Sequence, residues 1–316
     1  MKTTLDYVRM RTLGRTGLSV SPLGFGAASI GLLDTDQKRV SLILNQLLDD
    51  GINLIDTAAS YAGSEEAIGK AVAHRRDEYL LVSKCGQSLP DLQGREWSGP
   101  LIRATVDRSL KRLRTDRIEV MLLHSCSLET LRRGEAIEAL VKARDAGKIL
   151  FAGYSGDNEA AVFAARHSEL AVVEASISIV DQANIDALLP ITRENGTGLI
   201  AKRPIGNAAW RPLGDLPIFY QEYARPYHER FEAMGLHLDD LGLDPESTDW
   251  AEVALRFTLS QPGVDCAIIG TTSPYNARVN ADVASMPPLP ARTVQIIRQA
   301  FFQARQESGE DWPGLA

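Results

Sequence analysis

The sequence predicts an α/β fold, a (β/α)8 or TIM barrel in which eight parallel strands alternate with eight helices. Short β-branched or aliphatic runs alternate with longer segments of helical period, which is the pattern of repeated βα units. The length of 316 residues fits one large barrel domain as well as two average domains. Hydrophobic residues make up 44% and charged residues 24% of the chain, a balance that can fill a large core. An open doubly wound sheet shares this alternation, so the pattern favours the barrel and leaves that alternative open.

The expected strands are short runs in which aliphatic residues predominate. They cover residues 22–24, 53–56, 79–84, 118–124, 149–155, 172–176, 198–202 and 265–270. The expected helices cover residues 36–50, 65–73, 100–113, 134–146, 158–166, 187–195, 249–261 and 274–284. Gly51 follows the first helix and Gly147 follows the fourth, as expected of C-terminal caps. Asp34, Thr35 or Asp36 could cap the start of the first helix.

Four parts of the chain fall outside this repeat. Residues 7–20 are expected to form a β-hairpin that precedes the barrel. Residues 85–99 and 203–247 each follow a strand, so in a barrel these long loops lie at its C-terminal mouth, where functional loops gather. The tail over residues 290–306 is expected to add a helix. Because nothing resembles a linker, residues 1–316 are expected to form a single domain.

Charge, apolar segments and cysteines limit the classes of partner and compartment. Lysine and arginine total 34 against 41 acidic residues, so the net charge of −7 gives no general reason to bind nucleic acid or anionic lipid. The first residues contain no apolar leader segment and the chain has no run of about 18 apolar residues, so neither a signal peptide nor a membrane span is expected. The widely spaced Cys85, Cys126 and Cys266 fit a reducing cytosol better than disulfides. These features predict a cytoplasmic protein and do not bear on its oligomeric state.

Four polar residues lie at or just beyond the ends of successive expected strands. Asp56 ends the second strand, and Tyr61 lies in the loop that follows it. Lys84 ends the third strand and His124 ends the fourth. Because parallel strands place their C-terminal ends at one mouth of a barrel, these side chains are expected to share a pocket. Each residue alone is better explained by a structural role, whereas all four at successive strand ends favour a function.

Together the four residues fit acid–base chemistry at a carbonyl or alcohol group. An unperturbed phenol has a pKa of about 10, too high for an efficient acid–base catalyst at neutral pH. The Lys84 ammonium is expected to lower the pKa of Tyr61, and Asp56 can hold that ammonium in place. His124 could donate a hydrogen bond that orients a substrate carbonyl and stabilises developing negative charge. None of these groups performs redox chemistry, so the set predicts a separate hydride carrier.

The residues around these positions resemble the aldo-keto reductase superfamily. The segment Asn53-Leu-Ile-Asp-Thr-Ala-Ala-Ser-Tyr61, followed by Gly63-Ser-Glu-Glu66, looks like the signature of that superfamily. Similar segments along nearly the whole chain are Arg11 to Gly26, Leu81 to Lys84, Asp116 to His124, Gly147 to Ser155 and Ala254 to Val264. The resemblance implies a (β/α)8 barrel, bound NADP(H) or NAD(H), and a catalytic tetrad of Asp56, Tyr61, Lys84 and His124. It also implies that Tyr61 is the general acid and that hydride moves between nicotinamide C4 and the substrate carbon.

At the nicotinamide end the sequence departs from the pattern of the superfamily. Ser155 matches a serine that contacts the nicotinamide carboxamide, but Gly156 stands where asparagine is usual and Glu174 where glutamine is expected. An ionised glutamate can accept a hydrogen bond from the carboxamide NH2 but cannot donate one to its oxygen. Lys202 falls where many relatives have an aromatic residue that stacks on the nicotinamide. Lys202 or Arg203 is therefore expected to cover the ring or to reach the pyrophosphate, the alternative being that both are solvated loop cations.

The segment over residues 268–274 resembles the loop and helix start that grip the adenosine phosphates, since free N–H groups at a helix N-terminus suit an anion. NADP-selective relatives carry lysine and arginine where this chain has Gly270 and Asn276, and Arg278 could compensate. NADP(H) is therefore favoured from the resemblance alone, with NAD(H) as the alternative. The expected cofactor contacts are Gly26, Ser155, Glu174, Lys202, Arg203, Gly270, Thr271, Thr272, Ser273, Asn276 and Asn280.

The substrate is less closely defined by the sequence. Trp97 and Trp210, in the two long loops, could line a substrate pocket or could cover the core of the barrel. His124 and Cys126 are not accompanied by a second cluster of ligands, so no metal site is expected. The leading function is reversible reduction of an aldehyde, ketone or sugar, with a small carbonyl or alcohol as the partner molecule. The alternatives are an NAD-preferring sugar or alcohol dehydrogenase and a cofactor-binding regulatory subunit with little catalysis.

Overall fold

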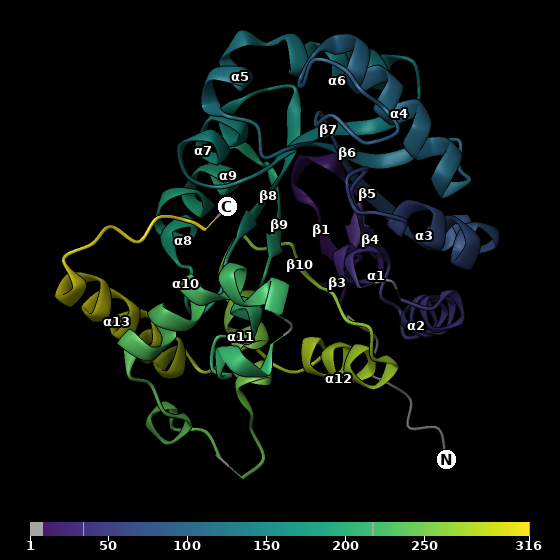
Figure 1. Ribbon diagram of the computed structural model, residues 1–316. Helices are drawn as coiled ribbons and strands as arrows, with labels where there is room; N and C mark the ends of the chain where they lie inside the picture. The colour runs from purple at the N-terminus through teal and green to yellow at the C-terminus, as the bar shows by residue number, and fades with distance from the viewer. Residues whose placement is uncertain (1–8, 34, 217, 245, 316) are drawn as a thin grey trace.

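The computed structural model describes residues 9–33, 35–216, 218–244 and 246–315, and its centre is a closed barrel of parallel strands (Figure 1). The order around the barrel is β10-β3-β4-β5-β6-β7-β8-β9, so successive strands are neighbours and the last pairs with the first. The strands are β3 (Leu23–Gly26), β4 (Leu54–Asp56), β5 (Leu80–Cys85), β6 (Ile118–His124), β7 (Ile149–Ser155), β8 (Leu170–Ser176), β9 (Gly198–Lys202) and β10 (Cys266–Ile269). The predicted barrel is confirmed, and an open sheet is excluded because β3 and β10 are hydrogen-bonded to each other.

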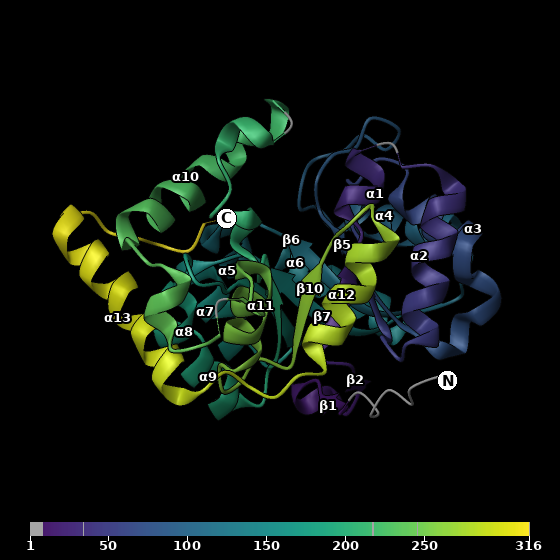
Figure 2. The same cartoon turned by 90° about the horizontal axis from the view of Figure 1, so that it is seen from below.

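Helices surround the strands and form an outer layer (Figure 2). The α-helices are α1 (Ala28–Leu32), α2 (Gln37–Asp49), α3 (Ser64–Val72), α4 (Gly99–Leu113), α5 (Leu128–Arg133), α6 (Glu135–Asp145), α7 (Asn158–Arg166), α8 (Ala183–Ala187), α9 (Leu189–Asn195), α10 (Ile218–Met234), α11 (Trp250–Leu259), α12 (Pro274–Ala284) and α13 (Ala291–Ser308). Short 3-10 turns are η1 (Gly14–Thr16), η2 (Ala73–Glu78), η3 (Gly206–Ala208), η4 (Leu213–Asp215) and η5 (Leu238–Leu241). Within the described part of the chain, no helix is both long and apolar enough to cross a membrane.

The two faces of each barrel strand pack into separate cores. In β6, Val120 and Leu122 belong to the core inside the barrel, whereas Met121 and Leu123 belong to the core between the strands and the helices. This alternation follows from the two-residue period of a strand. Burial on both faces also explains why the strands of a parallel barrel are nearly continuous apolar runs.

The three cysteines are free and buried in these two cores. Cys266 begins β10 and packs inside the barrel. Cys85 ends β5, and Cys126 follows β6 by two residues; both pack in the outer core. The thiols therefore act as small core side chains in the barrel wall.

A hairpin closes the N-terminal end of the barrel, with β1 (Arg11–Thr12) antiparallel to β2 (Ser19–Val20). Leu13 of this hairpin is packed into the core inside the barrel. Gly14 approaches the start of β9 so closely that a Cβ atom would meet the amide nitrogen of Gly198 at 2.2 Å, and its φ of +47° also favours glycine. The hairpin predicted over residues 7–20 is confirmed from residue 9 onward, and residues 7 and 8 lie outside the described ranges. Side chains fill this end of the barrel, so the opposite mouth is the open one.

The predicted caps of two helices agree with the backbone. The Asp36 side chain accepts a hydrogen bond from the amide of Arg39 at 3.3 Å and so caps α2. Asp34, one of the alternatives, lies outside the described residues. Gly51 and Gly147 follow α2 and α6 with φ values of 83° and 72°, the left-handed conformation that ends a helix without strain in glycine.

Several helices depart from the predicted pattern. The predicted helix over 187–195 corresponds to α9, which begins at Leu189 because Pro190 lacks an amide hydrogen and fits the first turn of a helix. The preceding helix α8 lies almost entirely in a segment where no helix was predicted. Short helices α1 and α5 lie in segments expected to be loops. The 17 residues of α10 lie inside the expected loop over 203–247 and pack against α13. The predicted C-terminal helix over 290–306 is confirmed as α13.

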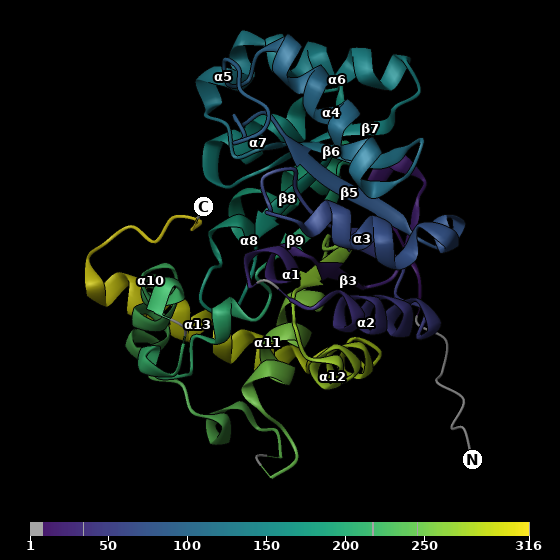
Figure 3. The ribbon, with the colours of Figure 1, turned by 45° about the vertical axis from the view of Figure 1, so that its right-hand side comes forward.

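The chain after α13 returns to the barrel. Figures 1 and 3 show this tail in yellow, leaving α13 and ending beside α8. The Asn158 amide donates to the carbonyl oxygen of Gly314 at 3.0 Å, and the amide of Leu315 donates to Asp181 Oδ2 at 3.0 Å. The tail therefore brings backbone groups close to the C-terminal ends of β8 and β9.

Candidate active site

A cavity of about 280 Å³ opens at the C-terminal ends of the strands. Asp56 is the last residue of β4, and Glu174 lies two residues before the end of β8. Tyr61 enters the cavity from the segment between β4 and α3. The lining residues are Gly26, Ala28, Ser29, Asp56, Tyr61, Glu174, Lys202, Arg203, Pro204, Ile205, Asn207, Tyr220, Tyr223, Ile268, Ile269 and Gly270.

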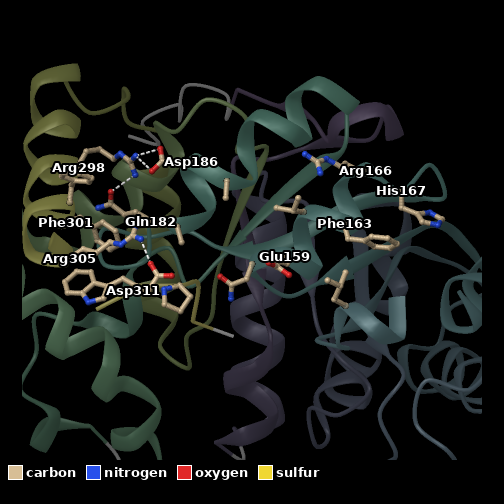
Figure 4. Close-up of a pocket in the computed structure, with 18 of the residues that line it drawn as sticks. Glu159, Phe163, Arg166, His167, Gln182, Asp186, Arg298, Phe301, Arg305 and Asp311 are labelled. Carbon is tan, nitrogen blue, oxygen red and sulfur yellow. Dashed lines mark hydrogen bonds and ion pairs between the residues drawn. The ribbon is translucent and has the colours of Figure 1, made fainter. Parts of the chain in front are cut away.

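A larger cavity, of about 990 Å³, lies outside the barrel between α7, α8, α13 and the tail (Figure 4). None of the residues singled out from the sequence lines it. Its polar groups pair with one another: the Arg298 guanidinium donates to Asp186 Oδ1 at 2.5 Å and to Gln182 Oε1 at 2.9 Å. We place the candidate site in the smaller cavity, because there groups that can exchange protons meet a buried cation.

One ammonium group lies between two carboxyl groups at the base of the smaller cavity. Lys84 Nζ donates to Asp56 Oδ1 at 2.6 Å and to Asp56 Oδ2 at 2.5 Å. It also donates to the carbonyl oxygen of Thr57 at 3.1 Å and lies 3.3 Å from Glu174 Oε2. The side chains of Asp56, Lys84 and Glu174 are each at most 3% exposed. These three residues are called the charge cluster below.

The charge cluster shifts the pKa values of its members. Burial, together with the neighbouring Glu174, raises the pKa of Asp56 well above its ordinary range. Burial acts most strongly to raise the pKa of Glu174, but the Lys84 ammonium, the Asp56 carboxyl group and the Lys202 ammonium together hold that pKa below the ordinary value. Burial alone would lower the pKa of Lys84, and the two carboxyl groups raise it instead. The ammonium is therefore retained at neutral pH, and the two carboxyl groups titrate as a pair.

Tyr61 and His124 lie beside the charge cluster. Lys84 Nζ lies 5.6 Å from the centroid of the Tyr61 ring, which meets the His124 ring edge-on at 5.8 Å between centroids. Burial raises the pKa of Tyr61 to about 12, although the Lys84 ammonium acts to lower it. The pKa of Tyr61 is therefore raised where the sequence predicted a lowering, because the loss of water outweighs the ammonium.

Burial, and after it the Lys84 ammonium, lowers the pKa of His124 to about 3. The imidazole is therefore neutral at pH 7. Its Nδ1 atom lies 3.3 Å from Ser60 Oγ. When the Ser60 hydroxyl donates to Nδ1, the ring proton is on Nε2, which is then free to donate a hydrogen bond.

At the expected nicotinamide end, the sequence-predicted residues lie together. The Ser155 hydroxyl donates to Glu174 Oε1 at 3.0 Å. Lys202 Nζ forms an ion pair with Asp157 Oδ2 at 3.0 Å. Arg203 adopts a left-handed φ of 55° and donates to Ser176 Oγ at 2.8 Å.

Arg203 is also held by the tail and by α10. Its Nη1 donates to the carbonyl oxygen of Leu315, and its guanidinium lies 5.2 Å from the centroid of the Tyr223 ring. Lys202 is thus buried in an ion pair, and the half-buried Arg203 is held by hydrogen bonds. The alternative that both are solvated loop cations is therefore wrong. Both line the cavity.

The segment before α12 has the caps of an ordinary helix start. Ser273 Oγ accepts from the amide of Asn276 at 3.3 Å, and Thr271 Oγ1 accepts from the amide of Ser273 at 3.1 Å. Gly270 lies against the end of β3: a Cβ atom on Gly270 would meet the carbonyl oxygen of Gly26 at 2.5 Å. Thr272 is half-buried in the same segment.

Farther along α12, Asn280 lines a separate small pocket with Thr248 and Asp249. Arg278, the cation expected to compensate near a 2′-phosphate, pairs with Asp282 at 3.2 Å and lies 3.6 Å from Asp50 Oδ1. Its guanidinium is therefore directed to carboxylates of α12 and the end of α2.

The two tryptophans expected near the substrate do not line the cavity. The Trp97 ring covers Gly86, where a Cβ atom would meet it at 2.1 Å, and it packs on the outer core. The Trp210 ring stacks on Trp250 at 6.4 Å between centroids. Among the residues that the structure describes, no group of His, Cys, Asp and Glu side chains could hold a metal ion.

The structure adds residues that the sequence did not single out. Asp157 is buried, accepts from the amide of Ser176 at 2.7 Å and pairs with Lys202. Tyr223 lines the cavity from α10 and contacts Arg203. Asp157 follows β7 by two residues, so its place after a strand end was a signal, whereas Tyr223 lies in a helix that the sequence did not predict.

Comparisons with known proteins agree with this fold. The model of the aldo/keto reductase family matches residues 22–301. The uncharacterized oxidoreductase YqkF of Bacillus subtilis (strain 168) is 27% identical over 301 residues, covering 92% of this chain and 96% of its own length. D-threo-aldose 1-dehydrogenase of a Pseudomonas species is 30% identical over 304 residues, covering 85% of this chain and 91% of its own.

A solved structure, the aldo-keto reductase AKR11C1 from Bacillus halodurans in its holo form, is 26% identical and matches with a TM-score of 0.78. The match covers 93% of this chain and 96% of that one. The chain therefore belongs to the aldo/keto reductase family and is a nicotinamide-dependent oxidoreductase that acts on carbonyl or alcohol groups.

Proposed function

We propose that the chain transfers hydride between a nicotinamide cofactor and an aldehyde, ketone or sugar, with Tyr61 as the general acid in reduction and the general base in oxidation. The observation that carries the proposal is the buried Asp56–Lys84 ion pair next to the Tyr61 ring, with Asp56 and Tyr61 lining one cavity at the mouth of the barrel. A neutral histidine beside the same ring supports it.

In the reductive direction, the Tyr61 hydroxyl gives its proton to the carbonyl oxygen of the substrate. The cofactor supplies the hydride when bound. The phenolate that forms is stabilised by the Lys84 ammonium, which Asp56 holds in place. The neutral His124 donates a hydrogen bond from Nε2 to the substrate oxygen and orients the carbonyl group. Oxidation of an alcohol uses the same groups in reverse.

Features of the cavity wall fit a nicotinamide cofactor. Glu174 Oε2 is buried and has no hydrogen-bond partner among the described residues, so it is available to the carboxamide NH2 group. Gly26 and Gly270 lie so close together that a side chain on Gly270 would collide with the backbone of Gly26, between the ends of β3 and β10. Ser155, Lys202 and Arg203 are proposed to contact the nicotinamide half of the cofactor. The residues proposed for the adenosine half are Thr271, Thr272, Ser273, Asn276 and Asn280.

The choice between the two nicotinamide cofactors depends on a 2′-phosphate. The resemblance favours NADP(H). Arg278 is paired with Asp282 and lies near Asp50, which supports the alternative, NAD(H), because binding a phosphate would break these ion pairs. Titration with NADPH and NADH distinguishes the two: a dissociation constant at least tenfold lower for NADPH, about 1.4 kcal/mol, would favour NADP(H).

The far wall of the cavity supports a hydroxylated substrate. Tyr220 and Tyr223 of α10 and Asn207 of η3 line it with polar groups. Two relatives are named as sugar oxidoreductases: the D-threo-aldose 1-dehydrogenase above and an L-galactose dehydrogenase of Arabidopsis thaliana, which is 25% identical. The second candidate function is accordingly a sugar dehydrogenase that works mainly in oxidation.

The decisive experiment replaces Tyr61 with phenylalanine. Loss of the phenol should lower turnover by about 100-fold to 10,000-fold, the usual contribution of a general acid, while cofactor binding is retained. Tyr79→Phe is the matched control, because Tyr79 is also a tyrosine but does not line the cavity. It is buried and immediately precedes β5. Unchanged turnover in Tyr61→Phe would remove the residue from its proposed role. Cofactor binding without any single-turnover hydride transfer in the unmodified protein would favour a regulatory subunit instead.

A further inference from the structure

Glu174 adds a second carboxyl group to an ion pair that is already complete. Asp56 holds the Lys84 ammonium through both of its oxygens, at 2.6 and 2.5 Å. Glu174 Oε2 lies 3.3 Å from the same ammonium and has no hydrogen-bond partner among the described side chains. Two carboxyl groups thus share one cation in a site that excludes water. The charge cluster carries more negative charge than its ammonium neutralises whenever both carboxyl groups are ionised.

We propose that Glu174 makes the site prefer the oxidised, cationic nicotinamide to the reduced, neutral one, so that cofactor binding itself is biased toward oxidation of the substrate. The inference rests on the proposed placement of the nicotinamide in this cavity. It concerns the affinity of the two redox states of the cofactor and not the identity of the general acid.

The physical basis is the change of charge on the nicotinamide ring. The ring carries a positive charge when oxidised and none when reduced, whereas the rest of the cofactor keeps its charge. A carboxylate in a low-dielectric site therefore attracts one redox state and is nearly indifferent to the other. A neutral glutamine at residue 174 would offer hydrogen bonds to both states and charge to neither.

The other charges around Glu174 stay in place when residue 174 is changed. The groups that face it from neighbouring strands and loops are Asp56, Tyr61, Lys84, His124, Lys202 and Arg203. Two further cations lie nearby: Lys202, which pairs with Asp157 at 3.0 Å and also acts to lower the pKa of Glu174, and Arg203, which donates to the neutral oxygens of Ser176 and Leu315. Both cations act on the nicotinamide whether residue 174 is glutamate or glutamine, so the change at residue 174 isolates the effect of its carboxylate. His124 and Tyr61 are neutral at pH 7 because burial favours their uncharged forms.

The shared ammonium also couples cofactor binding to a proton. With one cation between two carboxyl groups, the pair takes up a proton more readily than either group does in water. A cationic ring beside Glu174 favours the ionised pair and so releases that proton. Binding of the oxidised cofactor is then accompanied by proton release, and binding of the reduced cofactor is not.

The test measures dissociation constants rather than turnover. The unmodified chain and its Glu174→Gln variant are titrated at pH 7 with NAD⁺, NADH, NADP⁺ and NADPH, by calorimetry in two buffers of different ionisation enthalpy. Glu174→Gln should weaken binding of the oxidised form by about tenfold, roughly 1.4 kcal/mol, leave the reduced form unchanged or tighter, and abolish the difference between buffers. Glu174→Asp keeps the charge and should retain the preference.

The matched control is Glu65→Gln. Glu65 is a buried glutamate of α3 that accepts from Ser83 Oγ at 2.9 Å and lies outside the cavity lining, so its variant should leave the ratio of the two dissociation constants unchanged. The inference is overturned if Glu174→Gln weakens both redox states by the same factor, if Glu65→Gln moves the ratio equally, or if neither redox state binds. None of these outcomes depends on Tyr61, whose role is judged by turnover alone.

Discussion

Replacement of Lys84 by methionine is the sharpest test of the charge cluster, because it removes the ammonium that contacts both buried carboxyl groups. The side chain is 1% exposed, and its Nζ atom makes contacts of 2.5, 2.6, 3.1 and 3.3 Å with Asp56, Thr57 and Glu174. Removal of one partner from a buried ion pair typically costs about 3–5 kcal/mol, since the remaining charge is uncompensated. We expect a loss in this range in the free energy of unfolding at pH 7.

The loss should depend on pH in a defined direction. The pKa of Asp56 is about 3.9 in an unfolded chain and is raised in the folded protein, chiefly by burial. Without the ammonium, the pKa of Asp56 rises further, and the pKa of Glu174, which the ammonium helps to hold below its ordinary value, rises as well. Groups with a raised folded-state pKa cost nothing below the unfolded pKa and cost more as the pH rises through the interval above it. Lys84→Met should therefore be less destabilised at pH 5 than at pH 8.

Urea unfolding at pH 5, 7 and 8, followed by circular dichroism, measures these differences. The double variant Lys84→Met/Glu174→Gln should regain part of the lost stability, because it removes one of the two stranded carboxyl groups. Lys148→Met is the control: Lys148 forms a 2.5 Å ion pair with Asp107 in which both side chains are at least 40% exposed, so its loss should cost less than about 1 kcal/mol. Equal losses at pH 5 and pH 8, or a double variant less stable than the single one, would refute the reasoning.

Three further predictions concern the cavity wall. Gly270→Ala places a Cβ atom 2.5 Å from the carbonyl oxygen of Gly26. It should destabilise the chain by about 1–3 kcal/mol, measured by urea unfolding, and weaken cofactor binding, measured by titration. An alanine variant that binds the cofactor normally would contradict the close approach. His124 should show no protonation between pH 5 and 8 in an NMR titration, because burial lowers its pKa to about 3; a midpoint near pH 6.5 would show that the imidazole is solvated. Arg203→Ala removes the hydrogen bond to Leu315 and should increase proteolysis of the C-terminal tail while α13 stays protected; an unchanged cleavage rate would show that the tail is held by its other contacts.

The barrel could be predicted from the sequence because its strands and helices have strong local periods. Each predicted strand overlaps an observed one within a few residues, since burial on both faces makes strands such as Ile118–His124 continuous apolar runs. The helices α1, α5, α8 and α10 were not predicted. In α10, Pro226 and the many aromatic residues obscure the helical period, and packing against α13 supplies the stabilisation that local propensity lacks.

Some residues of the candidate site could be predicted from the sequence, but their pKa values and long-range contacts could not. Asp56 and Lys84 follow from their places at strand ends, because parallel strands bring those ends together, whereas Glu174 was identified only through the resemblance to the superfamily. The net pKa of Tyr61 did not follow, since it depends on how completely water is excluded. The contacts of Arg203 with the tail did not follow either, because they join residues 112 positions apart in the sequence. That residues 1–316 form a single domain stays a prediction.

The three buried cysteine thiols can report when the wall of the barrel opens. A thiol reagent added to the folded protein cannot reach Cys85, Cys126 or Cys266, which are 2%, 3% and 0% exposed, until the structure around each one opens. Burial also raises the pKa of Cys126 to about 12, so the reactive thiolate is scarce while the wall is closed. Cys266 faces the interior of the barrel and the other two face the helices. Labelling rates, resolved by mass spectrometry, would thus time the opening of the inner and outer layers separately, in one unmodified chain.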